Sequence, residues 1–415
     1  MSRFLFVVPP LVGHVNPAVA VAGELVARGH TVAWAGEPGL LARLLPDGGR
    51  VFACAVQPDW SARPDGLRGV AALKFLWERW FGPLAEAMLP GVAEAVERFR
   101  PDLVVADQQT VAGALAAERA GLPFVTLAST SGELTGAVGL PKVGAWTGEL
   151  LAGLRARFGD PGAGHDPRFS PWLTIVCSTP ELAGPVPRDK GPLAFVGPAL
   201  GARPRDAAFP WDWVGEDGGL PLVLVTLGTA NSAAGARFLG ACVAAVRERA
   251  DRLRAVVADP GGVLGPPSAA PGLLVRPVVP QLPLLAGAAA VVCHAGHNTV
   301  AEALWHGVPL VVAPIRDDQP VIAGQVTAAG AGVRVRFGRS GPETVGAALD
   351  AVLSGPGYAA SARRIGASFR AAGGAAAAAE RVEQVERAER PERAERAERA
   401  EKVGGGHMSA AAPER

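Results

Sequence analysis

The sequence lacks the features that would place the chain in a membrane or outside the cell. No apolar stretch is long enough to span a bilayer, and the N-terminal run Phe4 to Val8 is stopped by Pro9 and Pro10, too early for a signal peptide. No two cysteines are close in sequence, as a zinc site usually requires. We therefore predict a cytoplasmic protein with four reduced, buried thiols: Cys54, Cys177, Cys242 and Cys293.

An excess of charge and several catalytic signatures are absent as well. The net charge of +1 gives no reason to expect nucleic acid or an anionic membrane as a partner. The loop after the first strand carries one glycine, Gly13, and not GxGxxG, which disfavours an NAD-dependent oxidoreductase. No GxSxG, DxD or HExxH occurs, and His294 and His297 have no third metal ligand nearby. We therefore expect neither a metal nor a cofactor.

What the chain does have is enough length for two domains with their own cores, since 49% of its 415 residues are hydrophobic. After the strand Phe4 to Val8, Asn16 is expected to cap a helix with Pro17 in its first position. The next strand spans Thr31 to Ala35, which completes a right-handed βαβ unit. Strands and helices alternate in the same way as far as Val335, so the sequence predicts an α/β fold.

Composition sets the expected boundaries within this chain. Residues 201–219 lose all periodicity in a run of Pro, Gly and charge, as a linker between domains does. From residue 375 the charges alternate without an apolar stripe, so this tail is expected to be disordered or a solvated single helix. We predict domains over 1–200 and 220–356, a last helix over 357–374 and a tail over 375–415.

A phosphate site is predicted where the apolar strand 290–293 turns into a helix. The turn contains Gly296, which permits close approach, and Asn298 or Thr299 is expected to cap the helix. Free backbone N–H groups at a helix N-terminus attract anions. His294, at the same turn, has a ring N–H that is expected to donate to a phosphate oxygen.

Groups that bind hydroxyls follow directly. Glu302 shares a helix face with Thr299, and because a carboxylate repels phosphate, it is expected to accept from neutral hydroxyls. The next strand, 310–313, leads to a polar loop that ends in Asp318 and Gln319, two further acceptors. Phosphate at one end and hydroxyls at the other describe a nucleotide sugar.

Another polar pair follows two strands of the first half. His14 lies after the first strand, and Asp107 ends the strand over 101–106. The carboxyl ends of parallel strands share one edge of a sheet, so Asp107 is expected to fix the tautomer of His14 and to stabilise its imidazolium. Alternatively, His14 bonds to the backbone, and Asp107 caps a helix that begins near Thr110.

The pattern HxGxNT, a Glu three residues on, GVP and then PxxxDQ resembles the donor-binding signature of family 1 glycosyltransferases. This resemblance implies a GT-B fold, in which two Rossmann-like domains face each other across a cleft, and inverting sugar transfer without a metal. The first domain would bind the acceptor and the second the nucleotide sugar. The last helix, 357–374, would cross back to the first domain.

The resemblance also implies a role for each residue of the motif, and it makes His14 the catalytic base, held by Asp107. The turn after the strand 222–226 matches a family turn that approaches the donor phosphates. His294 would contact the diphosphate, supported by Gly296, Asn298 and Thr299. By this resemblance, the donor phosphates would be bound by Gly228, Thr229 and His294. Glu302 would bind the ribose, and Asp318 and Gln319 would bind the sugar.

The sequence departs from the family where many members place a tryptophan that stacks on uracil, because Val278 stands at that position. The base would then be held by backbone groups near Val279 and Gln281. Without the stacking ring, thymidine is as plausible a base as uridine.

The acceptor pocket is expected in the aromatic stretch 57–82, a region that tends to line it in this family. Its candidates are Trp60, Phe75 and Trp80; the alternative is that these side chains pack in the core. Residues 129–149 are small and Gly-rich, as in a mobile acceptor loop or plain surface.

The function implied is transfer of a sugar from a UDP or dTDP donor to a hydroxyl of a hydrophobic small molecule, such as a polyketide or macrolide antibiotic. We expect a monomer or weak homodimer. Two alternatives stay open: an auxiliary protein that binds nucleotide sugars without catalysis, and a nucleotide-sugar epimerase of the same fold. The presence of both His14 and Asp107 argues against the first, because a binding protein needs no base.

Overall fold

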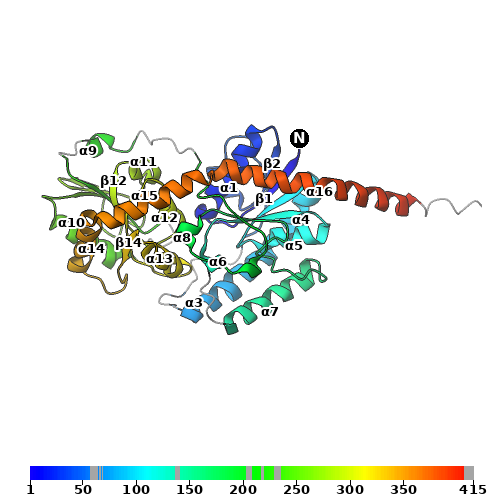
Figure 1. Cartoon of the computed structure of the whole chain (residues 1–415), viewed down its shortest axis with the longest axis horizontal. Helices are drawn as coiled ribbons and strands as arrows, with labels where there is room; N and C mark the ends of the chain where they lie inside the picture. The colour runs from blue at the N-terminus through cyan, green and yellow to red at the C-terminus, as the bar shows by residue number, and fades with distance from the viewer. Residues whose placement is uncertain are drawn as a thin grey trace, which may run out of the picture.

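The structure is a computed structural model, and it describes residues 1–56, 64, 67, 69–135, 141–201, 208–215, 219–228 and 235–405. Within these residues the strands form two sheets, which lie side by side with helices covering them (Figure 1). The expected α/β fold with two Rossmann-like domains is confirmed. No helix in the described ranges is long and apolar enough to cross a membrane.

The first sheet has the strand order β3-β2-β1-β4-β5-β6-β7, and its neighbouring strands are parallel. Helices cover both faces, so its central strands are apolar on both sides, and Phe4 to Val7 of β1 are fully buried. The strands are β1 (Arg3–Val7), β2 (Thr31–Gly36), β3 (Arg50–Ala53), β4 (Leu103–Asp107), β5 (Phe124–Ala128), β6 (Thr174–Val176) and β7 (Leu193–Phe195). The helical segments are α1 (Val12–Ala27), α2 (Pro38–Leu44), α3 (Gly69–Phe75), the π-helical η2 (Leu76–Phe81), α4 (Gly82–Phe99), α5 (Val111–Ala120), α6 (Gly132–Thr135), α7 (Pro141–Phe158), α8 (Pro180–Ala183) and the 3₁₀ turn η3 (Arg188–Lys190).

The second sheet has the order β10-β11-β9-β8-β12-β13-β14 and is parallel except at its edge, where β10 runs antiparallel to β11. Its strands are β8 (Leu222–Thr226), β9 (Arg254–Ala258), β10 (Ser268–Ala270), β11 (Leu273–Arg276), β12 (Ala288–Cys293), β13 (Leu310–Val312) and β14 (Gly332–Arg334). The helices are α9 (Trp211–Gly215), α10 (Ala236–Arg247), α11 (Gln281–Leu285), α12 (His297–Trp305), α13 (Gln319–Ala328), α14 (Pro342–Ser354), α15 (Pro356–Ala371) and α16 (Gly374–Gly405).

Helix α1 begins earlier than its sequence predicts. It starts at Val12, so that His14 lies in its first turn and Asn16 is not its cap. Pro17 therefore lies inside the helix, and because proline has no N–H, the carbonyl of Gly13 lacks its usual donor four residues on. That carbonyl is open to a donor from outside the helix.

Part of the predicted linker is folded onto the second domain. Phe209 is buried in the core of this domain, with Trp213 packed against it. The Arg254 guanidinium donates to the carbonyl of Trp213 at 2.8 Å and lies 5.3 Å from the centre of its ring. Residues 208–215 thus belong with the second sheet and not with a free connection.

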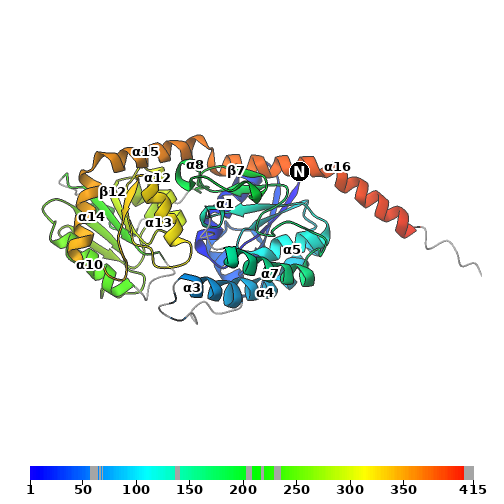
Figure 2. The ribbon, with the colours of Figure 1, turned by 60° about the horizontal axis from the view of Figure 1, so that its bottom comes forward.

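The predicted last helix, α15, packs against α12 and α14 of the second domain, and it reaches the first domain at its C-terminal end, where it contacts α8 and where the hydroxyls of Ser368 and Thr179 lie 2.8 Å apart. The chain then turns at Gly373 and Gly374, whose φ angles of 89° and 57° suit glycine. Helix α16 then runs along α1 of the first domain, and its far end extends away from the body of the molecule (Figures 1 and 2).

The prediction that the tail buries no surface was wrong. Ala378, Ala379 and Val382 are fully buried in the core shared with α1. Glu383 accepts from His30 at 2.9 Å and from Arg28 at 3.3 Å, which fixes the helix beside the end of α1. The apolar stripe escaped notice because it consists of small residues among many charges.

The docking of α16 can be tested with Val382→Asp, which would place an unpaired carboxylate in the core between α16 and α1. We expect the free energy of unfolding to fall by more than about 2 kcal/mol and the tail to become sensitive to proteolysis. Gln384→Asp introduces the same carboxylate at an exposed position of the same helix and is the control. Equal behaviour of the two variants in urea unfolding would show that the tail is not docked.

Candidate active site

The carboxyl ends of the strands of both sheets face one cleft, and polar contacts join the domains across it. Parallel sheets place their ligand sites at this edge. The contacts link the first turn of α1 to α12, the segment after β5 to α13, and the end of β6 to α12. The residues predicted from sequence are found on both sides of this cleft.

His14 and Asp107 lie together at the edge of the first sheet. Strands β1 and β4 are neighbours, so the first turn of α1 after β1 lies beside the end of β4. The Nδ1 of His14 is 2.9 Å from Oδ2 of the buried Asp107. With Nδ1 donating to the carboxylate, Nε2 keeps its lone pair and is the ring atom able to take a proton.

Ser129 completes this group and was not predicted. It follows β5, the neighbour of β4 on the other side, and its hydroxyl donates to Asp107 Oδ2 at 3.2 Å while lying 2.8 Å from His14 Nδ1. The sequence offered a signal, since a polar residue directly after a buried strand sits at the same edge as Asp107. The stretch 129–149, which Ser129 opens, is predicted instead to be a mobile acceptor loop or plain surface.

The charge state of His14 is set from both domains. Burial lowers the pKa of His14, but the negative charge and hydrogen bond of Asp107, together with the charge of Asp318 from the second domain, outweigh this effect and raise the pKa above its usual value. The base is thus held more strongly protonated than a free histidine.

The turn between β12 and α12 brings backbone close to the ring of His294. Ala295 has a φ of 64°, an unusual value for a residue with a side chain. A Cβ on Gly228 would lie 2.8 Å from Cε1 of His294, and a Cβ on Gly296 would overlap Nε2 of the same ring. Both glycines are therefore required by the close approach of two turns around this histidine.

His294 is neutral at physiological pH. Burial lowers the pKa of its imidazole to about 4, an effect that a backbone hydrogen bond to Thr226 opposes and the charge of Arg316 reinforces. Its Nδ1 is buried and has no hydrogen-bond partner among the described residues. A buried ring nitrogen without a partner suits a site whose ligand supplies one.

Helix α12 begins one residue earlier than predicted, and its N-cap is Gly296, without a side-chain cap. The prediction of Asn298 or Thr299 as cap was wrong. Asn298 instead donates from Nδ2 to the carbonyl of Gly13, the one that Pro17 leaves open in α1. The first N–H groups of α12 are thus left to another acceptor.

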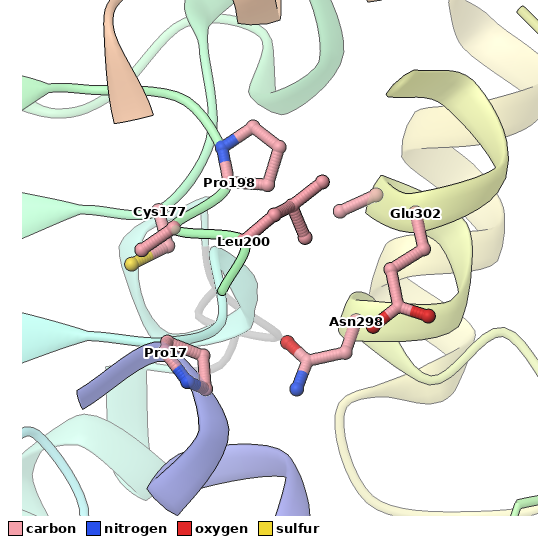
Figure 3. A pocket seen from close by; sticks show the side chains of 8 residues that line it. Pro17, Cys177, Pro198, Leu200, Asn298 and Glu302 are labelled. Carbon is pink, nitrogen blue, oxygen red and sulfur yellow. The ribbon is translucent and has the colours of Figure 1, made fainter. Parts of the chain in front are cut away.

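Glu302 is buried on α12, and its Oε2 accepts from Nε2 of Gln281 at 2.7 Å. The same amide lies 3.4 Å from the hydroxyl of Thr299. Glu302 and Asn298 line a small pocket between the domains, which Figure 3 shows with Pro17 and Leu200 opposite them. The full lining is Pro17, Cys177, Pro198, Ala199, Leu200, Asn298, Ala301 and Glu302.

The Asp318 carboxylate faces the first domain. Its Oδ2 accepts from the Thr130 hydroxyl at 2.6 Å. Burial raises the pKa of Asp318, and the charges of Asp317 and Glu133 add to this, while Thr130 and His14 act against it. The partly buried side chain thus joins α13 to the segment after β5.

The Gln319 side chain organises its own loop. Its carbonyl accepts from the backbone N–H groups of Ile315 and Arg316, at 2.9 and 3.1 Å. The carbonyl of Gln319 is therefore already used within its own loop.

His297 was left without a role by the sequence, and it lies in the domain interface. Its Nε2 donates to the carbonyl of Cys177 at 3.1 Å. Burial lowers the pKa of His297 to about 4, against the effect of the Cys177 hydrogen bond and together with the charge of His14. It is therefore a neutral donor that joins α12 to the end of β6.

The remaining predicted residues are not brought to the cleft in the same way. Thr229 and Trp60 lie outside the described residues. Trp80 is buried in the core of the first domain, and Phe75, at the end of α3, is half-buried; for Trp80 the expected pocket position is replaced by core packing. Val279 packs against the core of the second domain.

Val278, at the position of the family's tryptophan, is 76% exposed. Metal ligands do not cluster either. Within the described ranges, no three His, Cys, Asp or Glu side chains come together so that they could hold a metal ion.

Two Rossmann-like domains, with a histidine–aspartate pair on one side of the cleft and a glycine-containing strand–helix turn on the other, match the GT-B class of glycosyltransferase. The model of the family described as UDP-glucoronosyl and UDP-glucosyl transferase matches residues 259–368. Demethyllactenocin mycarosyltransferase of Streptomyces fradiae is 30% identical over 338 residues, covering 76% of this chain and 71% of its own. The chain belongs to this family, the family 1 glycosyltransferases.

Other similarities extend over nearly the whole chain. 4'-Demethylrebeccamycin synthase of Lentzea aerocolonigenes is 28% identical over 403 residues, which is 88% of this chain and 94% of the relative. The crystal structure of the glycotransferase of kitacinnamycin has a TM-score of 0.74 at 25% identity and covers 92% of this chain and 98% of its own. The enzyme class and the fold are thus the same throughout.

Gly296 closely approaches the His294 ring in the turn between β12 and α12, which is called the donor turn below. This close approach predicts the effect of Gly296→Ala. The new methyl group must displace the ring of His294 or the turn itself, so we expect binding of nucleoside diphosphate to weaken by at least about 10-fold, with a loss of about 1–3 kcal/mol in stability. Gly324→Ala in α13 is the control, because a Cβ there meets nothing. Unchanged affinity in Gly296→Ala, measured by calorimetry, would contradict the proposed crowding.

Proposed function

We propose that this glycosyltransferase moves a sugar from a UDP or dTDP donor to a hydroxyl of a hydrophobic small molecule, with inversion and without a metal. The observation that supports this best is the position of His14, bonded to Asp107 at the cleft edge and facing the donor turn of α12 across it. The names of the relatives, a mycarosyltransferase and a demethylrebeccamycin synthase, favour a natural product as the acceptor.

In the proposed reaction, Nε2 of His14 takes the proton of the acceptor hydroxyl as its oxygen attacks the anomeric carbon. The bond from that carbon to the diphosphate oxygen breaks on the opposite face, and the nucleoside diphosphate leaves with the electron pair. Asp107 stabilises the imidazolium that forms, and Ser129 keeps the carboxylate in place.

The leaving diphosphate is met by the N-terminus of α12 and the ring of His294. The N–H groups of the first turn and the helix dipole stabilise negative charge there. A neutral His294 has a single N–H, so in this proposal that proton lies on Nδ1 and the diphosphate replaces the Thr226 carbonyl as its acceptor. Glu302 would accept from the ribose hydroxyls, and the amide of Gln319 together with Asp318 would hold the sugar.

The two alternatives make different demands on the same cleft. An auxiliary binding protein has no use for a base raised in pKa by two carboxylates, and an epimerase would act on the donor without an acceptor. The His14 group lies on the domain opposite the donor turn, where an acceptor hydroxyl has to be deprotonated. Free buried cysteines also agree with the proposed cytoplasmic location.

The donor site is tested by titrating UDP and TDP into the protein in excess chelator. We expect one of them to bind, and Glu302→Ala to weaken it by about 10- to 100-fold, since a hydrogen bond to a charged group contributes about 1.5–3 kcal/mol. Glu343→Ala, at an exposed position of α14, should leave the affinity unchanged. If neither nucleotide bound, the donor site would be refuted.

The base is tested by the pH dependence of kcat/KM for the acceptor. His14 must be neutral to take a proton, so activity should rise with pH through the raised pKa of His14, above 6.5. Asp107→Asn removes one of the charges that raise this pKa, so the acidic limb should move to lower pH, while the plateau falls by about 10²-fold or more. A limb that stayed in place would show that another group titrates.

A further inference from the structure

Two buried polar side chains directly after Asp107 have no hydrogen-bond partner. Both Nε2 and Oε1 of Gln108 lack one, as does Oγ1 of Thr110. Gln108 is 2% exposed and Thr110 is 1% exposed, so among the described residues neither is satisfied by the protein. An amide buried in this way costs free energy unless a ligand completes its hydrogen bonds.

The position of Gln108 relates it to the acceptor side of the cleft. Along β4, Ala106 belongs to the core layer under α4 and α5, whereas Asp107 faces His14 on the side of α1. Gln108 follows β4 in a turn, and its backbone N–H still donates to the carbonyl of Leu127 in β5 at 3.0 Å. It stands at the same strand end as the catalytic pair.

The adjoining layer has a second feature typical of functional sites. The segment Leu76–Phe81 is π-helical, and such turns recur where a helix is shaped for a ligand. It carries Trp77 and Trp80, which belong to the same core layer as Ala106. The strand end that carries Gln108 is thus bordered by an apolar layer.

We propose that Gln108, assisted by Thr110, determines acceptor specificity by reading a carbonyl or amide group on an otherwise apolar acceptor. The acceptor would lie across the end of β4, with its reacting hydroxyl at His14 and the polar group at Gln108. The amide of Gln108 donates from Nε2 and accepts at Oε1, so a lactam or imide would satisfy both atoms. This inference rests on the proposed function and narrows its class of acceptor.

The first test is the stability of Gln108→Leu. If the amide is unsatisfied in the protein alone, replacing it with an apolar side chain of similar size leaves the midpoint of urea unfolding unchanged or raises it. A structural amide, bonded within the fold, gives the opposite sign. A clearly lowered midpoint would therefore overturn the proposal.

The second test compares two bicyclic phenols, a hydroxyquinolinone that carries a lactam and a naphthol that lacks it. The ratio of their kcat/KM values should favour the lactam in the native enzyme and fall by about 10- to 100-fold in Gln108→Leu. The change should lie mainly in KM for the acceptor. An unchanged ratio, or turnover of neither phenol by an enzyme that binds nucleotide, would refute this acceptor class.

Gln109→Leu is the matched control, because it makes the same chemical change one residue along at a half-buried position. It should keep the preference for the lactam. Calorimetric affinity for UDP or TDP separates this inference from the proposed function. A loss of lactam preference with intact nucleotide binding supports Gln108, whereas absence of nucleotide binding in the native chain would refute the donor site itself.

Discussion

The hydrogen bond from Asn298 to the carbonyl of Gly13 joins the first turns of two helices, and the rest of the site is arranged around it. Helix α1 carries the proposed base on that turn, and α12 carries the proposed diphosphate site. The acceptor of this bond is available because Pro17 supplies no helical N–H to Gly13. A residue that disfavours a helix interior thus creates the point at which the two halves of the active site meet.

Three histidines share the cleft, and their environments set them to different charge states. Burial alone would keep each of them neutral. His294 and His297 follow this rule, with pKa values near 4. His14 departs from it because Asp107 and Asp318 face it from two domains. The same cleft therefore contains two neutral histidines on the side of α12 and a titrating histidine on the side of α1.

The sequence predicted the polar residues that directly follow strands, because their positions depend only on the order of strands in the sheet. His14 and Asp107 come together because β1 and β4 are neighbours, and the polar residues of the donor turn are contiguous in the chain. It missed what depends on packing between segments far apart. Ser129 enters the group of His14 through the pairing of β5 with β4, and Gln281 reaches Glu302 from a different helix.

The errors at helix starts have a related cause. Asn298 has the chemistry of a cap, and a local rule predicted one. In the folded chain its amide is used across the cleft instead, and Gly296 takes the cap position. Likewise, the alanines of α16 do not by themselves predict a buried face. In the structure, however, Ala378 and Ala379 are buried in the core shared with α1. Tertiary contacts outweighed local preference in both places.

The end of the chain has a mechanical consequence. Helix α15 packs against α12, and α16 packs against α1. These two consecutive helices therefore contact the two elements that carry the donor turn and the proposed base. Gly373 and Gly374, both with positive φ angles, connect the two helices. The elements that carry the proposed base and the donor turn are therefore each backed by one of two consecutive helices, so a displacement of α1 relative to α12 would have to be taken up at Gly373 and Gly374.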